Sequence, residues 1–202
     1  MNLIDRVKNI ITRPNLEWDI ISNEIPDTNK IITSYVVPLV GAAALAAFIG
    51  YSFIGYNAFG FRVRGINWGI YQTLAVFLVG LLSVFVTAYV VDMLAPSFAS
   101  EKNFPRSLQL VAYSFTPAWV GRLLAILPPI AFIGALFSIY CFYLMYIGMP
   151  KLKRIPPDRL IGYFVVSVII TIVVYFILNW IVTTLLYSIL NLSYRTPFDY
   201  RP

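Results

Sequence analysis

The 202-residue sequence contains no histidine and a single cysteine, Cys141. Without imidazole the chain cannot form His-based zinc sites, activate a serine through a Ser-His pair, or relay protons through imidazole rings. One thiol supplies neither a disulfide framework within the chain nor a thiolate metal site. We therefore expect no metal centre and no bound cofactor.

Charged residues are also scarce, at 12% of the chain. Asp92 is the only acidic residue near the end of an apolar run, so a paired-carboxylate site would lack its second acid. The phosphate-binding patterns GxGxxG and GxxxxGK[ST] are both absent. We predict that the protein is not an enzyme.

The composition is dominated by hydrophobic residues, at 59% of the chain, which is typical of an integral membrane protein. Charged residues divide the chain into five long uncharged runs, at 31–61, 65–91, 107–121, 123–150 and 160–194. Four runs exceed the ~20 residues that cross ~30 Å of hydrocarbon. The third has only 15 residues, but the long stem of Arg122 can extend toward the interface and lengthen it.

We therefore predict an all-α polytopic membrane protein with one bundle of five transmembrane helices. A cytoplasmic N-terminal segment, 1–30, precedes the bundle, 31–190, and a polar tail, 191–202, follows it. The expected spans are about 31–56, 69–94, 105–127, 130–149 and 160–190.

The net charge of +6 is first a topology signal in such a protein, and it does not imply nucleic-acid binding. With the N-terminus inside, five spans place ten of the 15 basic residues in the cytoplasm. If the third run were a re-entrant loop, four spans would place only nine inside. We predict a cytoplasmic N-terminus and an outside C-terminus. The first 30 residues lack an apolar stretch with a cleavage site, so we expect no removed signal peptide.

The N-terminal segment begins with a short amphipathic pattern. In residues 2–12, apolar side chains recur at helical spacing, opposite polar and charged ones. This helix either anchors the protein on anionic lipid or caps the cytoplasmic end of the bundle, and both readings stay open. The candidate lipid or partner contacts are Arg6, Lys8, Arg13, Trp18, Lys151, Lys153 and Arg154.

The third span is too polar to face lipid on all sides. Gln109, Tyr113 and Thr116 are spaced i, i+4, i+7, so they form one stripe that must meet other helices or water. Pro117 should kink this helix, because it removes a backbone hydrogen bond. A short connection should bring Asp92 and Arg106 together as a charge pair at the inner end. The candidate intramembrane polar site is Asp92, Arg106, Gln109, Tyr113 and Thr116.

Three motifs, taken in their order, resemble those of the Yip family. They are P-x-x-x-W-x-x-I-x-x-E at 14–24, SLQLVAYSFTP at 107–117 and YLMYIGMPKLKRIPPDRLIGY at 143–163. The resemblance implies five spans and a cytoplasmic N-terminus. Eukaryotic members are named for interaction with Ypt/Rab GTPases and carry a long cytosolic tail. The short N-terminal segment here is closer to prokaryotic relatives, which implies the inner (cytoplasmic) membrane.

Two hypotheses for function follow. The first is a non-enzymatic membrane organiser or adaptor, whose N-terminal helix and basic inner loops contact anionic lipid or a membrane or cytoplasmic protein partner. The alternative is a small-solute or ion carrier or channel that uses the polar face of the third span. The shortage of charge at the midplane favours the first hypothesis. The sequence does not determine the oligomeric state.

Overall fold

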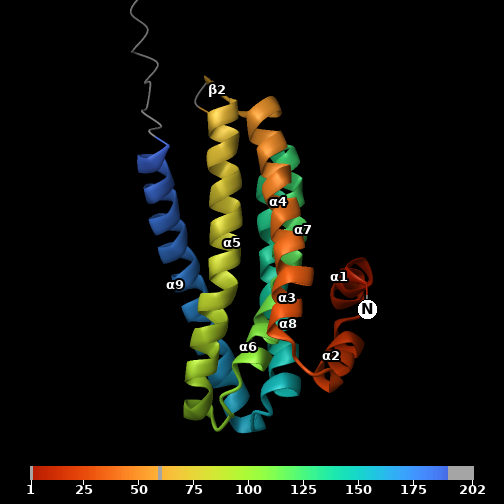
Figure 1. The fold of residues 1–202 in the computed structure, drawn as a ribbon. Helices are drawn as coiled ribbons and strands as arrows, with labels where there is room; N and C mark the ends of the chain where they lie inside the picture. The colour runs from red at the N-terminus through yellow and green to blue at the C-terminus, as the bar shows by residue number, and fades with distance from the viewer. Residues whose placement is uncertain (1, 59–60, 191–202) are drawn as a thin grey trace, which may run out of the picture.

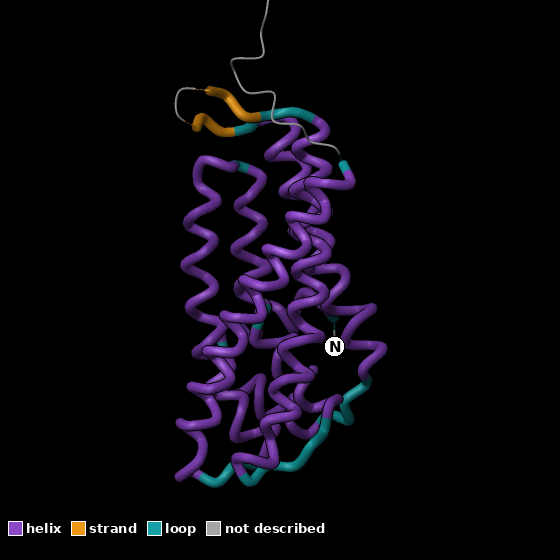
Figure 2. Tube along the Cα trace, turned by 90° about the vertical axis from the view of Figure 1, so that its left-hand side faces the viewer, coloured by secondary structure: helices purple, strands orange, loops and turns teal. Residues whose placement is uncertain are grey.

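The structure, a computed structural model, describes residues 2–58 and 61–190. It is a bundle of long helices that run side by side (Figure 1). Figure 2 shows two short strands at one end of the bundle and most of the loops at the other. We call these the hairpin end and the loop end. The predicted tail, 191–202, lies outside the described residues.

The loop end contains the connections at 95–103 and 154–156, and the strands at the hairpin end pair antiparallel with Tyr56 opposite Val63. The helices and strands are α1 (Leu3–Thr12), α2 (Pro14–Asn23), α3 (Thr28–Ile31), α4 (Val37–Ile49), β1 (Tyr56–Ala58), β2 (Phe61–Val63), α5 (Ile66–Leu94), α6 (Phe104–Ser114), α7 (Thr116–Arg122), α8 (Ala131–Lys153) and α9 (Pro157–Ile189). Short π-helical turns at Ile32–Val36 and Gly50–Ile54 extend α4 at both ends, and 3-10 turns occupy Ala95–Phe98, Leu123–Ile126 and Pro128–Ile130.

Four helical segments among the described residues are long and apolar enough to cross a membrane. They are Thr28–Ile54, Ile66–Phe98, Pro128–Lys153 and Pro157–Ile189. These correspond to the first, second, fourth and fifth predicted spans. Length and composition thus support four spans, and the third is a different kind of segment.

The third pass through the bundle consists of α6, α7 and the turn at Leu123–Ile126. Figure 1 shows α6 near the loop end and α7 beside α4, closer to the hairpin end. A Cβ atom added to Gly50, at the end of α4, would lie 1.9 Å from the Ala125 carbonyl oxygen. The third pass therefore extends along the bundle as far as the end of α4. Whether it makes a fifth membrane span stays a prediction.

The break in the third pass lies at Phe115, between α6 and α7. Pro117, two residues on, has no N–H and cannot donate to the Tyr113 carbonyl one turn back. The Thr116 hydroxyl donates to that carbonyl instead, at 2.8 Å. The predicted kink is confirmed, and the Tyr113 carbonyl, which receives no hydrogen bond from residue 117, is satisfied within the third pass.

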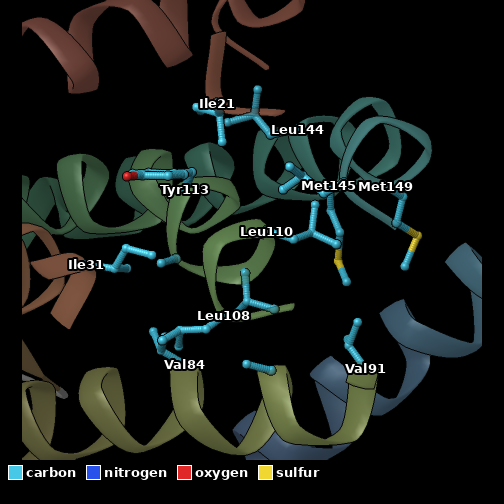
Figure 3. Close-up of a cluster of buried hydrophobic side chains, with 14 of the residues drawn as sticks. Ile21, Ile31, Val84, Val91, Leu108, Leu110, Tyr113, Leu144, Met145 and Met149 are labelled. Carbon is cyan, nitrogen blue, oxygen red and sulfur yellow. The ribbon is translucent and has the colours of Figure 1, made fainter. Parts of the chain in front are cut away.

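The core is built around α6, in which every residue from Ser107 to Ser114 is buried. Figure 3 shows Leu108 and Leu110 of α6 among side chains from α5 and α8. By contrast, only 22% and 17% of the most apolar stretches in the segments containing α8 and α9 are buried. The first helix of the third pass, α6, is the buried centre, whereas no residue of the turn at Leu123–Ile126 is buried and α8 and α9 form the most exposed faces.

Two glycines let α7 and α8 cross closely. A Cβ atom on Gly134 would lie 2.3 Å from the Gly121 carbonyl oxygen, and one on Gly121 would lie 2.6 Å from that of Gly134. Small residues allow such backbone contact between helices in a membrane. The α7–α8 hairpin is therefore tight, which holds the broken third pass against α8.

Candidate functional site

The N-terminal helices α1 and α2 pack on the side of the bundle, next to α8 (Figure 1). Ile10, Trp18 and Ile21 are completely buried, and Leu3 and Val7 pack against the same core. Burial of such side chains stabilises the docked position by roughly 1.5–3 kcal/mol each. The helix pair thus covers the side of the bundle, whereas the predicted alternative to a lipid anchor was a cap on its cytoplasmic end.

Arg6 is the charged centre of this contact. Its Nη1 donates to Glu17 Oε1 at 2.7 Å, and its Nη2 donates to Glu24 Oε1. The guanidinium also lies 5.3 Å from the ring centroid of Tyr113 on α6. Burial works against the charge, but the bond to Glu24 and the nearby Tyr113 and Glu17 outweigh it and raise the pKa of Arg6.

Arg6 is therefore a structural cation that ties α1 to α2 and to the third pass. Its side chain is only 7% exposed, so it does not face lipid headgroups. Arg6 was predicted as a lipid or partner contact, but here its buried charge is compensated by Glu17 of α2 and by Glu24, the C-terminal cap of α2.

Three further polar contacts join α1 and α2 to α8. The Tyr140 hydroxyl donates to the Ile11 carbonyl at 2.9 Å. Lys151 Nζ donates to the Asn15 carbonyl at 2.8 Å and lies 2.6 Å from Asp19 Oδ1. These contacts are spread from the middle of α8 to its C-terminal end, so they fix the helix pair along α8.

Trp18 can pack closely against α8 because Gly148 has no side chain. A Cβ atom there would lie 2.7 Å from the Trp18 ring and 2.9 Å from Leu110 Cδ1. Trp18 was predicted as a lipid or partner contact, but its side chain is completely buried. Its flat ring fits into a notch in α8, and apolar burial there outweighs interfacial placement.

Asp92 lies at the loop end and forms a compact polar cluster. Its Oδ1 accepts from the Asn103 backbone N–H at 2.7 Å, the Ser107 hydroxyl at 2.9 Å and Lys153 Nζ at 3.1 Å. The Lys153 side chain is 1% exposed and also donates to the Glu101 carbonyl at 3.0 Å. The cluster joins the C-terminal ends of α5 and α8 to the start of α6.

The predicted Asp92–Arg106 pair does not form. Arg106 Nη1 donates instead to the Ile21 carbonyl at 3.2 Å and to Gln109 Oε1 at 3.0 Å. Successive residues of a helix point about 100° apart, so Ser107 faces Asp92 while Arg106 faces α2. Lys153, predicted as a lipid or partner contact, is buried and pairs with Asp92 in place of Arg106.

The polar stripe of the third pass is satisfied mainly by protein. Thr116 gives its own proton to the Tyr113 carbonyl, so the Tyr35 hydroxyl is the donor in the 2.7 Å bond between Tyr35 and Thr116. Tyr113 packs edge-on against the Tyr35 ring, with centroids 4.7 Å apart. Gln109 and Tyr113 also line a cavity of about 420 Å³ beside Arg6, which Thr116 does not reach.

The face of α1 and α2 that points away from the bundle combines apolar side chains with charges of both signs, since Asp5 and Asp19 are exposed as well as two cations. Lys8 and Arg13 are exposed, and Ile4, Leu16 and Ile20 are 70%, 63% and 49% exposed. Leu16 and Ile20 were absent from the predicted contacts, although their i, i+4 spacing on α2 could have identified them. We call the two cations and the three apolar residues the outer face.

The remaining predicted contacts lie at the loop end. Arg154 is exposed, and the Lys151 side chain is 25% exposed beside Asp19. No group of three or more His, Cys, Asp or Glu residues that could hold a metal ion occurs in the described part of the chain. The polar groups thus join helices to one another, and the free cations lie on the surface.

A helical bundle with four candidate membrane spans among the described residues and a docked N-terminal helix pair defines a class of multi-pass membrane proteins. The Yip1 domain matches residues 8–192, so the chain belongs to the Yip1 domain family, as the motifs predicted. The chain is similar to the inner membrane protein YohC of Escherichia coli (strain K12), with 23% identity over 161 residues, which is 77% of this chain and 83% of YohC. The YohC protein of Escherichia coli O6:H1 (strain CFT073) matches to the same extent. No solved structure matches the chain.

Proposed function

We propose that the protein is a non-enzymatic membrane adaptor of the inner membrane, whose outer face contacts anionic lipid headgroups at the cytoplasmic surface. The observation that carries this proposal is the composition of that face. Exposed isoleucine and leucine side chains beside Lys8 and Arg13 are typical of helices that lie at a membrane surface.

The location and the orientation rest on related arguments. The similar YohC proteins are inner membrane proteins by name. Most basic residues, including Lys102, Arg154 and Arg159, lie at the loop end or on the N-terminal helices, which supports a cytoplasmic loop end. Five spans, with a broken third span, then bring the C-terminus outside.

Docking of α1 and α2 makes the contact useful to an adaptor. The pair is tied to the bundle by the contact of Arg6 with the Tyr113 ring and by Tyr140 and Lys151, so a headgroup or partner bound at the outer face is held at a fixed place relative to the membrane helices. Preorganisation of this kind lowers the conformational entropy lost on binding.

A fluorescent label at one outer-face position tests this proposal. We replace Cys141 by Ala and Ile20 by Cys, attach an environment-sensitive dye, and titrate phosphatidylglycerol into the full-length protein in neutral detergent. The fluorescence emission of the dye should shift to shorter wavelength. Each cation near an anionic surface contributes about 1 kcal/mol to binding. Lys8→Gln with Arg13→Gln should therefore weaken the apparent affinity for phosphatidylglycerol about 30-fold at low salt.

The matched control removes the same charge from the loop end, by Lys102→Gln with Arg159→Gln, and should leave the dye response unchanged. If the dye responds equally in both double variants, non-specific attraction explains the signal and the proposal is wrong. If the dye does not respond to lipid at all, the outer face is not a lipid contact, and a protein partner becomes the better hypothesis.

The carrier hypothesis has one observation in its favour, the cavity of about 420 Å³ beside Gln109 and Tyr113. Against it, Arg6 and Glu24 in the cavity wall are paired with each other, and Thr116 is bonded to Tyr35. Solute uptake by vesicles reconstituted with the wild-type protein would move the assignment from adaptor to carrier.

A further inference from the structure

A second cavity lies between α5, α9 and the α4–α7–α8 group, at the middle of α5 and α9 and toward the hairpin end of α8. Its volume is about 490 Å³, within the range of ligand-binding pockets. Many of its lining residues are alanines, whose short side chains leave space in the bundle: Ala43, Ala47, Ala118, Ala125, Ala131 and Ala135. It shares no lining residue with the outer face or with the cavity beside Arg6.

The cavity is elongated along the bundle. On α5 its lining extends from Gln72 to Thr87, which corresponds to ~22 Å of helix rise. One leaflet of a bilayer contributes about half of the ~30 Å hydrocarbon thickness. The cavity is thus long enough to hold an extended hydrocarbon chain through the leaflet at the hairpin end.

The cavity walls farther from the hairpin end are mainly apolar. Ser83, Thr171 and Cys141 each donate to a carbonyl four residues back in their own helix, so those groups are satisfied without a ligand. Thr87 is the one lining residue with a buried oxygen that has no partner among the described groups. A hydrocarbon chain fits these walls better than a polar solute does.

One charged residue lines the cavity, at its end closer to the hairpin. Arg122, the last residue of α7, donates through Nη2 to the Tyr175 hydroxyl at 2.8 Å, and its guanidinium lies 6.0 Å from the Tyr175 ring centroid. No carboxylate among the described residues lies within ion-pair distance of Arg122. A cation in a membrane bundle without an acidic partner is electrostatically suited to an anion.

The cavity also opens sideways. Ala135 of α8 and Ile172 and Phe176 of α9 line it and are exposed, so the opening lies between these two helices. Figure 1 shows that α9 lies on the other side of α5 from α4 and α7. A chain in the surrounding bilayer could enter between α8 and α9 without crossing a polar region.

We propose that this cavity binds one phospholipid from the leaflet at the hairpin end, with an acyl chain along the apolar walls and the phosphate on Arg122. The guanidinium is planar and offers several N–H donors, which suits a phosphate oxygen pair. Tyr175 orients the guanidinium from one side. The site is separate from the outer face, which lies on α1 and α2 at the side of the bundle.

Native mass spectrometry of the full-length protein tests the proposal. Phosphatidylglycerol added to the detergent-solubilised protein should give a one-to-one adduct. Arg122→Gln removes the charge-assisted bonds and should weaken the adduct about tenfold or more. Ala135→Phe, which places a ring in the side opening, should weaken it similarly while Arg122 stays intact.

The controls match each change. Leu136→Phe alters the neighbouring exposed residue of α8, which does not line the cavity, and should leave the adduct unchanged. Lys8→Gln with Arg13→Gln should also leave it unchanged. Thermal melting checks that every variant is folded, and Ala135→Phe decides the question if Arg122→Gln does not fold.

Two results would overturn the proposal. Equal adducts in the wild type and Ala135→Phe would place the lipid elsewhere on the protein. Displacement of the lipid by equimolar inorganic phosphate would mean that the acyl chain contributes nothing and that Arg122 binds a free anion.

Discussion

Replacement of Asp92 by Asn should destabilise the protein strongly, because it leaves the Lys153 ammonium without its carboxylate. Asp92 Oδ1 and Lys153 Nζ are 3.1 Å apart, and their side chains are 13% and 1% exposed. An amide at position 92 can still accept from the Asn103 N–H and the Ser107 hydroxyl. The main loss is therefore electrostatic.

Removal of one partner from a buried ion pair typically costs roughly 3–5 kcal/mol, since the other charge stays buried. Lys153→Met should cost less, because Asp92 is partly exposed and keeps two hydrogen bonds. In the double variant no buried charge is left unpaired. We expect a coupling energy near the upper part of the usual range of about 0.5–3 kcal/mol.

The assay is equilibrium unfolding in mixed detergent micelles for the wild type, the two single variants and the double variant. A parallel cycle with Arg106→Gln in place of Lys153→Met should be additive within about 0.5 kcal/mol, because Arg106 contacts Ile21 and Gln109 instead. Additive losses in the Asp92–Lys153 cycle, or strong coupling in the Asp92–Arg106 cycle, would refute the reasoning.

Three further predictions concern docking, the third pass and topology. Gly148→Leu should displace Trp18, cost about 1–3 kcal/mol through overpacking and expose α1 and α2 to limited proteolysis, whereas Gly162→Leu on α9 should not expose them. Tyr35→Phe should lower the unfolding free energy by about 1 kcal/mol, because Thr116 loses its donor, and Tyr89→Phe at an exposed position should have no effect. Reporter fusions at the two termini should report opposite sides of the membrane, and two cytoplasmic signals would contradict five spans.

The sequence was sufficient to predict the membrane class and the buried centre. Long uncharged runs identify four spans directly, since hydrocarbon thickness sets the length of a crossing helix. The polarity of the run at 107–121 predicted that it would be buried, and Pro117 predicted its break. These properties are local, so a single sequence contains them.

The pairing of charges could not be predicted in the same way. Asp92 is closer in sequence to Arg106 than to Lys153, but the pairing depends on which face of α6 meets α5 and on where α8 ends. Arg6 resembled a surface cation by spacing alone. Its burial depends on Glu17 and Glu24, which the turn between α1 and α2 brings onto the same guanidinium. Long-range packing decides both cases.

The central claim is that α1 and α2 are docked on α8 in the membrane-embedded protein, and cysteine cross-linking tests it most directly. Lys151 Nζ and Asp19 Oδ1 lie 2.6 Å apart, so cysteines at these two positions, with Cys141→Ala, should be joined by a short thiol-reactive cross-linker within one chain. We predict efficient cross-linking in native membranes, its loss in the Gly148→Leu background, and none with either cysteine alone. If the two cysteines do not cross-link in folded protein that keeps Gly148, the helices are not docked and the account is wrong.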